Sequence, residues 1–183
     1  KVPEPTNREL ALSVNQCTVN PPDTHILARG NPHVPGAKVA PGFPRVLGSP
    51  DPAIPPPKPD ARTAGRRQLL ANWIASPDNR LTPRVIANRL WQHHLGRGIV
   101  RTTNDFGKLG EKPTHPELLD WLAAEVIERG WRLKAMHKLI MLSNTYQMSS
   151  RDDPAVHRVD PANDLFWRFD PRRLTAEELR DSI

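Results

Sequence analysis

Apolar residues recur at the spacing of an amphipathic helix in four stretches of the chain, residues 63–75, 83–95, 116–129 and 134–147. Side chains three and four residues apart share one face of a helix, so each stretch predicts a helix with one apolar side. The apolar stripe comprises Leu118, Leu119, Leu122, Ala123 and Val126 in the third stretch, and Met136, Leu139, Ile140 and Leu142 in the fourth. We expect these residues to be buried between packed helices.

The second stretch has marked ends. Thr82 stands before Pro83, a favoured first residue of a helix, and Gly96 and Gly98 follow the last apolar position. The segment 82–98 therefore predicts one complete helix.

A further helix is predicted at the end of the chain, where Thr175 and Glu178 have the spacing of a capping box. This helix is cut short at Ile183, and the chain begins at Lys1 without Met or a signal segment. We therefore expect a piece of a longer protein, truncated at its C-terminus.

The N-terminal third has a different pattern. Residues 8–14 and 24–30 have the character of short strands, and residues 33–47 form a run with many Pro and Gly residues that is typical of loops and edge strands. Residues 49–61 contain consecutive prolines, which favour a stiff, extended linker.

These patterns predict a mainly α fold, with a bundle-like core of about four to five helices and an irregular, Pro-rich N-terminal region that contains short strands. We divide the chain into an extended segment over 1–48 that packs on the core, a linker over 49–61, and a helical domain over 62–183 that is truncated at its C-terminus.

Composition restricts the possible partners. The chain has 183 residues and a formal net charge of +6, but its arginines are spread along the sequence among acidic residues. This distribution indicates dispersed surface charge rather than a nucleic-acid-binding face, and the long loop after residue 98 does not fit a helix-turn-helix. No apolar run has the length of about 20 residues that a membrane span requires. We therefore expect no nucleic-acid partner and no membrane span.

Polar residues are concentrated on the helix predicted over 83–95. Arg84, Asn88 and Gln92 are spaced at four-residue intervals and share one face, and Arg89 and His93 flank it. Such a stripe suits the binding of phosphate, sulfate or carboxylate groups, because Arg offers paired donors. Alternatively, it is a solvated face or holds the loop over 99–115 in place, and we favour this structural role.

The loop over 101–116 adds Asn104, Asp105 and His115 to the candidate binding residues. The triplet that begins at Asp105 matches the metal-binding triplet of protein kinases, but the other kinase motifs are missing, so we expect an ordinary turn. His93 and His94 point about 100° apart on a helix and are a poor chelating pair. We keep His94 among the candidate binding residues and expect it to be half-buried and hydrogen-bonded. We expect no metal site.

Most of the chain resembles a known family. The matching segments are RRQLLANWIASPDNRLTPRVIANRLWQHHLGRGIVRTTNDFG, THPELLDWLA, GWRLKAMHKLIMLSNTYQMSS and DPANDLFWRFDPRRLTAEELRD, preceded by RGNPHVPGAKVAPGFPRVL. They resemble the planctomycete-type domain of unknown function numbered fifteen fifty-three. The resemblance implies a large exported protein, periplasmic or otherwise extracytoplasmic, often with a c-type cytochrome-like domain near its N-terminus. The family has no accepted catalytic residues to carry over.

The single cysteine, Cys17, is not part of a haem-attachment motif, so we expect no cofactor in this fragment and haem only in a neighbouring domain. Two functions follow as hypotheses. The first is an accessory binding or assembly module, with other domains of the same polypeptide as partners and polysaccharide as a second partner class. The alternative is a hydrolase-like enzyme domain for a complex carbohydrate, with a polar site formed by the helix over 84–94 and the loop over 101–115.

Overall fold

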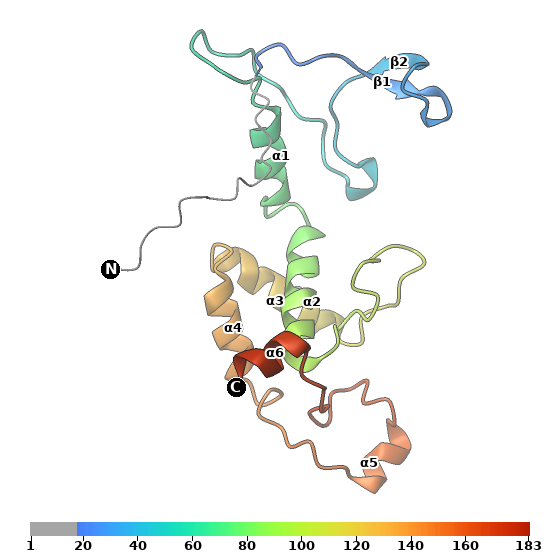
Figure 1. The fold of residues 1–183 in the computed structure, drawn as a ribbon, viewed down its shortest axis with the longest axis vertical. Coiled ribbons are helices and arrows are strands. Elements are labelled where there is room, and N and C mark those ends of the chain that lie inside the picture. The colour runs from blue at the N-terminus through green and yellow to red at the C-terminus, as the bar shows by residue number, and fades with distance from the viewer. Residues whose placement is uncertain (1–17) are drawn as a thin grey trace. The chain divides into compact units, whose positions relative to one another are not determined.

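The computed structural model describes residues 18–183, and the strand expected over 8–14 lies outside the described residues. The chain divides into two compact units, Lys1–Trp73 and Ile74–Ile183, and we describe each by itself. The fold is mainly α, with one small two-stranded sheet in the described part, as the sequence patterns predict (Figure 1).

The first unit contains a β-hairpin. Strand β1 (Thr24–Leu27) pairs antiparallel with β2 (Pro35–Val39), and Thr24 lies opposite Val39. A short 3-10 turn over Ala28–Gly30 begins the connection between the strands. Both strands fall within the segments where the sequence predicts strands.

Helix α1 (Arg66–Ile74) completes the first unit. The ring of Trp73 stacks on Phe43 with centroids 4.6 Å apart, and its indole N–H donates to the Ser49 hydroxyl at 2.9 Å. A second 3-10 turn covers Arg45–Leu47, and residues 49–58 have no helix or strand. These contacts attach the helix to the irregular chain, but no residue of α1 is fully buried.

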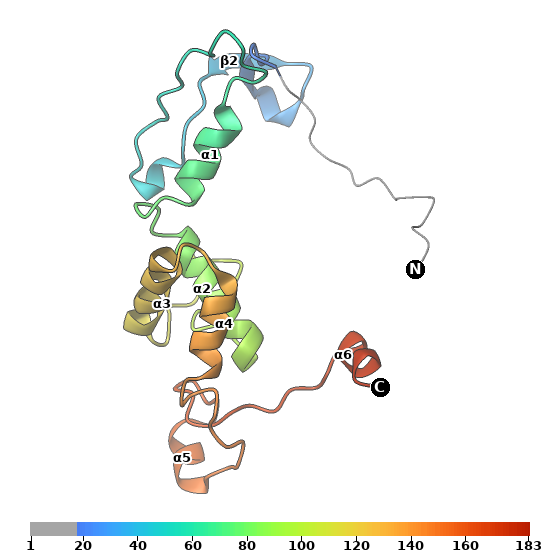
Figure 2. The same ribbon diagram turned by 90° about the vertical axis from the view of Figure 1, so that its left-hand side faces the viewer.

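The core of the second unit consists of α2 (Thr82–Leu95), α3 (Pro116–Glu128) and α4 (Leu133–Met141), which lie side by side (Figures 1 and 2). Each of these helices contacts the other two. The side chains buried among them include Leu90, Trp91, Leu95, Leu119, Leu122, Val126, Met136 and Ile140. The apolar stripe predicted for the third helix therefore faces the core.

Helix α4 is shorter than the sequence pattern predicts. It ends at Met141, and residues 142–147 form turns instead of continuing the helix to residue 147. The Ser143 hydroxyl donates to the Ile140 carbonyl at 2.6 Å and accepts from the Tyr146 N–H at 3.3 Å, so a serine side chain replaces the next helical hydrogen bonds. Leu142 was expected in the core, but its position beyond the helix end leaves it 63% exposed.

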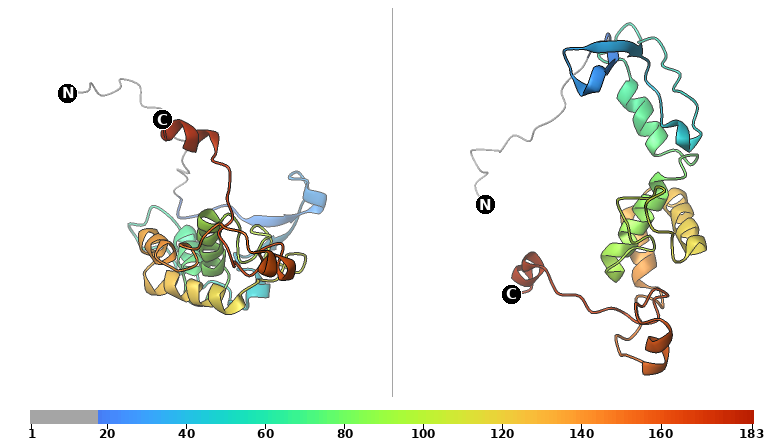
Figure 3. Two further views of the ribbon diagram at one scale, coloured as in Figure 1. Left: turned by 90° about the horizontal axis from the view of Figure 1, so that it is seen from below. Right: turned by 90° about the vertical axis from the view of Figure 1, so that its right-hand side faces the viewer.

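Two short helices follow. Helix α5 (Pro154–Val159), which the sequence patterns did not predict, begins with Asp153, whose carboxylate accepts from the Ala155 N–H at 2.9 Å. Helix α6 (Ala176–Asp181) has the predicted capping box between Thr175 and Glu178. A segment without regular secondary structure joins the two helices (Figures 2 and 3).

Candidate functional site

Asn88, in the middle of the predicted polar stripe, is a buried residue with 0% exposure. Its amide donates to the Val100 carbonyl at 2.9 Å and accepts from the Val100 N–H at 2.8 Å. The close approach requires glycine at position 98, because a Cβ there would lie 2.6 Å from the Asn88 amide nitrogen. Asn88 thus holds the start of the 99–115 loop and is not available to a ligand.

The two arginines of the stripe also bind the protein itself. Arg89 is exposed and donates to the Asn104 side chain at 2.9 Å, across the loop. Arg84 donates to the Asp120 carboxylate of α3 at 2.6 Å, and this hydrogen bond lowers the pKa of Asp120. These contacts connect α2 to the loop and to α3.

The 99–115 loop is ordered by its own hydrogen bonds. Thr114 donates its N–H to the Ile99 carbonyl at 3.0 Å, and the Thr102 hydroxyl accepts from the Glu111 N–H at 2.9 Å. The Asp105 carboxylate accepts from the Gly107 N–H at 2.8 Å, as expected for a turn. Gly110 is needed for space, because a Cβ there would lie 2.1 Å from the Asp105 carbonyl oxygen.

The histidines do not form one cluster. His94 is half-buried, and its Nε2 lies 2.7 Å from Nδ1 of His137 on α4. Burial lowers the pKa of His94, and the charges of His137 and His93 lower it further. His115 instead lies against Phe166, with its Nδ1 3.0 Å from the Thr114 hydroxyl.

Of the remaining stripe residues, Gln92 is half-buried and His93 is exposed. Among the candidate binding residues, the structure brings Arg89 and Asn104 into direct contact, whereas the hydrogen bonds of Arg84, Asn88 and His94 go to residues outside the candidate set. The arrangement explains how the loop is fixed and provides no shared polar pocket.

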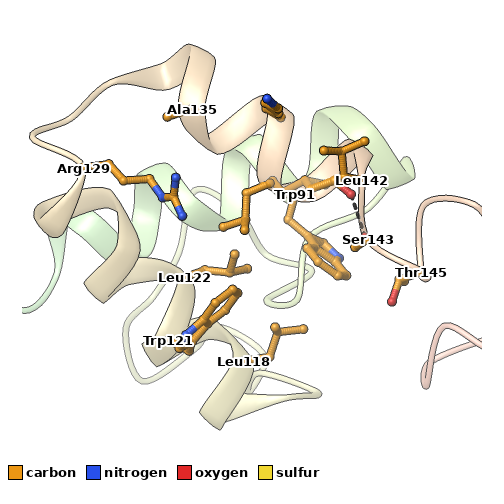
Figure 4. A pocket seen from close by; sticks show the side chains of 12 residues that line it. Trp91, Leu118, Trp121, Leu122, Arg129, Ala135, Leu142, Ser143 and Thr145 are labelled. Atoms are coloured by element: carbon orange, nitrogen blue, oxygen red, sulfur yellow. Dashed lines mark hydrogen bonds between the residues drawn. The ribbon is translucent and has the colours of Figure 1, made fainter.

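An apolar hollow of the second unit lies elsewhere, between α3 and α4. It has a volume of about 600 Å³ and is lined mostly by apolar side chains, among them Leu118, Trp121, Leu122, Leu139 and Leu142 (Figure 4). We call this hollow the α3–α4 groove. Trp121 is 49% exposed at its wall, and the sequence patterns did not single it out.

The α3–α4 groove also has polar features. Trp91 lines it with a side chain that is only 4% exposed, and its indole N–H has no hydrogen-bond partner among residues 18–183. Arg129 and Thr145 lie toward opposite ends of the groove (Figure 4), and Lys138 adds a second cation to the lining. Because this N–H is itself enclosed, it is an unsatisfied donor in the core beneath the groove.

A second polar cluster, which the sequence analysis missed, orders the chain after α5. Asp160 accepts from the N–H groups of Asp164 and Leu165, and the buried Asn163 bonds the backbone of Trp167 and Arg168. Arg97, just beyond α2, donates to the Asn163 carbonyl and pairs with Asp170 at 3.1 Å. The spacing of Asp160 and Asn163 around a turn is the sequence signal that could have indicated this cluster.

Arg97 is the charged residue that connects this cluster to the end of α2. Burial lowers its pKa, whereas the carboxylates of Asp170 and Asp160 raise it. Its guanidinium also lies 5.3 Å from the ring centroid of Phe166. Because Arg97 is paired with these groups, its positive charge serves to hold the C-terminal segment.

Residues 18–183 contain no group of three or more His, Cys, Asp or Glu side chains placed to hold a metal ion. None of the helices in this part of the chain combines the length and apolar character that crossing a bilayer needs.

The fold and the groove together define a mainly helical domain with an apolar groove. The chain belongs to the family described as PSD1, protein of unknown function (DUF1553), whose family model matches residues 66–183. The matched range includes α1, the helical core and the C-terminal segment through α6. No curated protein and no solved structure gives a significant match to the chain.

Proposed function

We propose that this domain is a non-catalytic assembly module of a larger polypeptide and that the α3–α4 groove takes up an apolar segment of that same polypeptide. The observation that carries the proposal is the groove itself, with its volume of about 600 Å³ and its partly exposed Trp121 and Leu142. Exposed apolar surface in a concave site marks a contact region rather than ordinary solvent-facing surface.

The use of the polar residues supports a non-catalytic role. A general acid or base must reach a bound substrate, but Asn88 is buried against Val100 and Arg89 binds Asn104. His94 has its Nε2 next to His137. The side chains of Asn88, Arg89 and His94 are therefore engaged in holding α2, α4 and the loop together.

The biological setting of the proposal rests on the sequence resemblance to exported proteins. We propose an extracytoplasmic polypeptide in which any haem belongs to a neighbouring domain. Polysaccharide is a second partner class, because the exposed indole of Trp121 offers a flat apolar surface of the kind that sugar rings stack on.

The proposal is tested in the longer polypeptide that carries this chain, with the groove variant Trp121→Ala/Leu142→Ser. Both side chains are largely exposed in the chain, so their removal leaves the helical core intact. If the groove is filled, their loss removes buried apolar contact on the order of 2 kcal/mol and lowers the thermal unfolding midpoint. Leu109→Ser is the matched control, because Leu109 is 92% exposed on the loop.

Equal unfolding midpoints for the groove variant and the Leu109→Ser control would contradict the assembly role. The enzyme alternative has its own test, a screen of the polypeptide against complex carbohydrates with His94→Asn as the variant. Hydrolysis that is lost in His94→Asn, but kept in the groove variant, would replace the assembly module by a hydrolase.

A further inference from the structure

The two outer rims of the α3–α4 groove carry charges of opposite sign. Helix α3 contains acidic residues and no Lys or Arg, whereas α4 contains lysines and no Asp or Glu. Glu117 and Glu128 are four and seven residues from Trp121, so they lie on the same side of α3 as this groove residue. Lys134 stands four residues before Lys138, which lines the groove from α4. The groove therefore has an acidic rim on α3 and a basic rim on α4.

The charges on these two rims have no ion-pair partner among residues 18–183. The other acidic residues of α3 are paired within the domain. Asp120 binds Arg84 of α2 at 2.6 Å, and Glu125 binds Arg129 at 2.6 Å. The two glutamates and two lysines of the rims form no ion pair within the described chain, and all four are exposed. The charges that flank the groove are thus available to a partner.

Between the rims, the apolar side chains have the spacing of helix-packing surfaces. Leu118, Trp121 and Leu122 stand at positions i, i+3 and i+4 of α3. Leu139 of α4 stands three residues before Leu142, which follows the end of that helix. Trp121 and Leu142 are 49% and 63% exposed. Both walls are helical and offer no sheet edge for an added strand, so the groove suits an occupant that is itself helical.

A second copy of the same surface matches all of these features. When a two-fold axis runs along the groove, the rotation exchanges its two sides, so α3 of one copy lies opposite α4 of the other. Each acidic rim then faces a basic rim, and the exposed Trp121 of either copy meets the apolar α4 wall of the other. A two-fold interface requires such a self-complementary surface, whereas rims of a single sign would repel a second copy.

We propose that the α3–α4 groove is a homodimer interface in which α3 of each copy packs on α4 of the other. This inference rests on the proposed assembly function and identifies the apolar segment that fills the groove as the α3–α4 surface of a second copy. The charges on the rims fix the orientation of the two copies, and the apolar side chains between the rims supply the buried contact.

The test measures the mass of the whole 183-residue chain by sedimentation equilibrium over a range of concentrations, and the wild-type chain should form dimers. Lys134→Glu/Lys138→Glu and Glu117→Lys/Glu128→Lys each place like charges opposite one another. Each variant alone should therefore dimerise with a dissociation constant at least about tenfold higher. An equimolar mixture of the two variants should form heterodimers, because the rims are again of opposite sign. Recovery in the mixture also shows that both variants are folded.

The matched control is Lys108→Glu/Lys112→Glu, which reverses two exposed lysines of the same unit outside the groove and should leave the dissociation constant unchanged. A wild-type chain that stays monomeric, a dimer that persists in either reversed variant, or a mixture that stays monomeric would overturn the inference. If any of these results is found while Trp121→Ala/Leu142→Ser still destabilises the longer polypeptide, a segment of a single copy fills the groove, and the assembly function stands without dimerisation.

Discussion

At the scale of single residues, the side chain of Asn88 fixes the path of the backbone after α2. A carboxamide presents one acceptor and one donor group, and Asn88 uses both on the backbone of Val100. Neither backbone group of Val100 has to be paired by a neighbouring strand or helix. The buried side chain of Asn88 thus provides the hydrogen bonds that a neighbouring strand or helix normally provides to buried backbone N–H and carbonyl groups.

Asn88→Ala is expected to lower the free energy of unfolding by about 2–3 kcal/mol, because it leaves the N–H and carbonyl of Val100 buried without partners. Urea denaturation measures the change. Arg89→Ala, on the exposed side of the same helix, is the control and should cost much less. Similar losses for the two variants would mean that the loop is held by its surface contacts and not by Asn88.

His94 makes the stability of the domain depend on pH. Burial and the neighbouring histidines lower the pKa of His94 below its ordinary value of 6.5, so the unfolded chain binds a proton more readily than the folded chain. Its contribution to stability is therefore complete above pH 6.5 and is lost as the pH falls from 6.5 toward the lowered pKa.

The measurement is the unfolding free energy between pH 8 and pH 5, about the range in which histidine titrates. The wild-type chain should lose stability on the acidic side, and His94→Asn should show a shallower decrease. A steeper decrease in His94→Asn would contradict the assignment. His115→Asn is the control, since His115 lies outside this pair.

The sequence identified the types of residue in the polar stripe but not their partners. Arg84, Asn88 and Gln92 have the same spacing pattern, yet Arg84 binds α3, Asn88 is buried and Gln92 is half-buried. Helical periodicity predicts on which face of the helix a residue lies. It does not predict which other segment of the chain packs against that face. For this reason the pairing of His94 with His137, which lies 43 residues further along the chain, could not be predicted.

At the scale of elements, helix ends were predictable where a local rule sets them. Gly96 has the left-handed conformation, with φ of 85°, and its N–H closes the last turn of α2 as the pattern predicts. The capping box of α6 is a similar case. The end of α4 was placed too late because apolar spacing continues through Leu142, while the Ser143 hydroxyl takes over the hydrogen bonding.

The main candidate surface was also hidden at this scale. The candidate residues of the sequence analysis lie on the polar face of α2 and on the following loop, whereas the groove is lined mostly by apolar side chains of α3 and α4. Trp121 lies in a helix that the pattern predicted well, but exposure of an aromatic residue depends on how far two helices separate. That separation follows from packing and is not encoded in the spacing of one helix.

At the scale of the whole molecule, the two units differ in how much they bury. All fully buried residues among 18–183 belong to the second unit, and the first unit has a two-stranded sheet and one helix. A two-stranded sheet is marginal without a larger apolar core. The stability of the first unit then depends on local contacts such as the Phe43–Trp73 stack.

We expect the chain to unfold in two steps, with backbone amides of residues 18–73 exchanging with solvent faster than those of α2, α3 and α4. Hydrogen exchange followed by mass spectrometry distinguishes the units. Phe43→Ala should speed exchange in the first unit and leave the three helices unchanged. Uniform protection across both units, or a change that spreads to α3, would show a single cooperative structure instead.

The hydrogen bonds that close the 99–115 loop have a consequence for how the sequence can diverge. The Ile99–Thr114 and Thr102–Glu111 contacts fix both sides of the loop base, so the position of α3 relative to α2 is set before the chain reaches the tip. The tip at Lys108 and Leu109 is exposed. Residues can be inserted or deleted at this tip without changing how α3 is placed against α2. The tip is therefore the point at which the loop most easily accommodates an inserted domain.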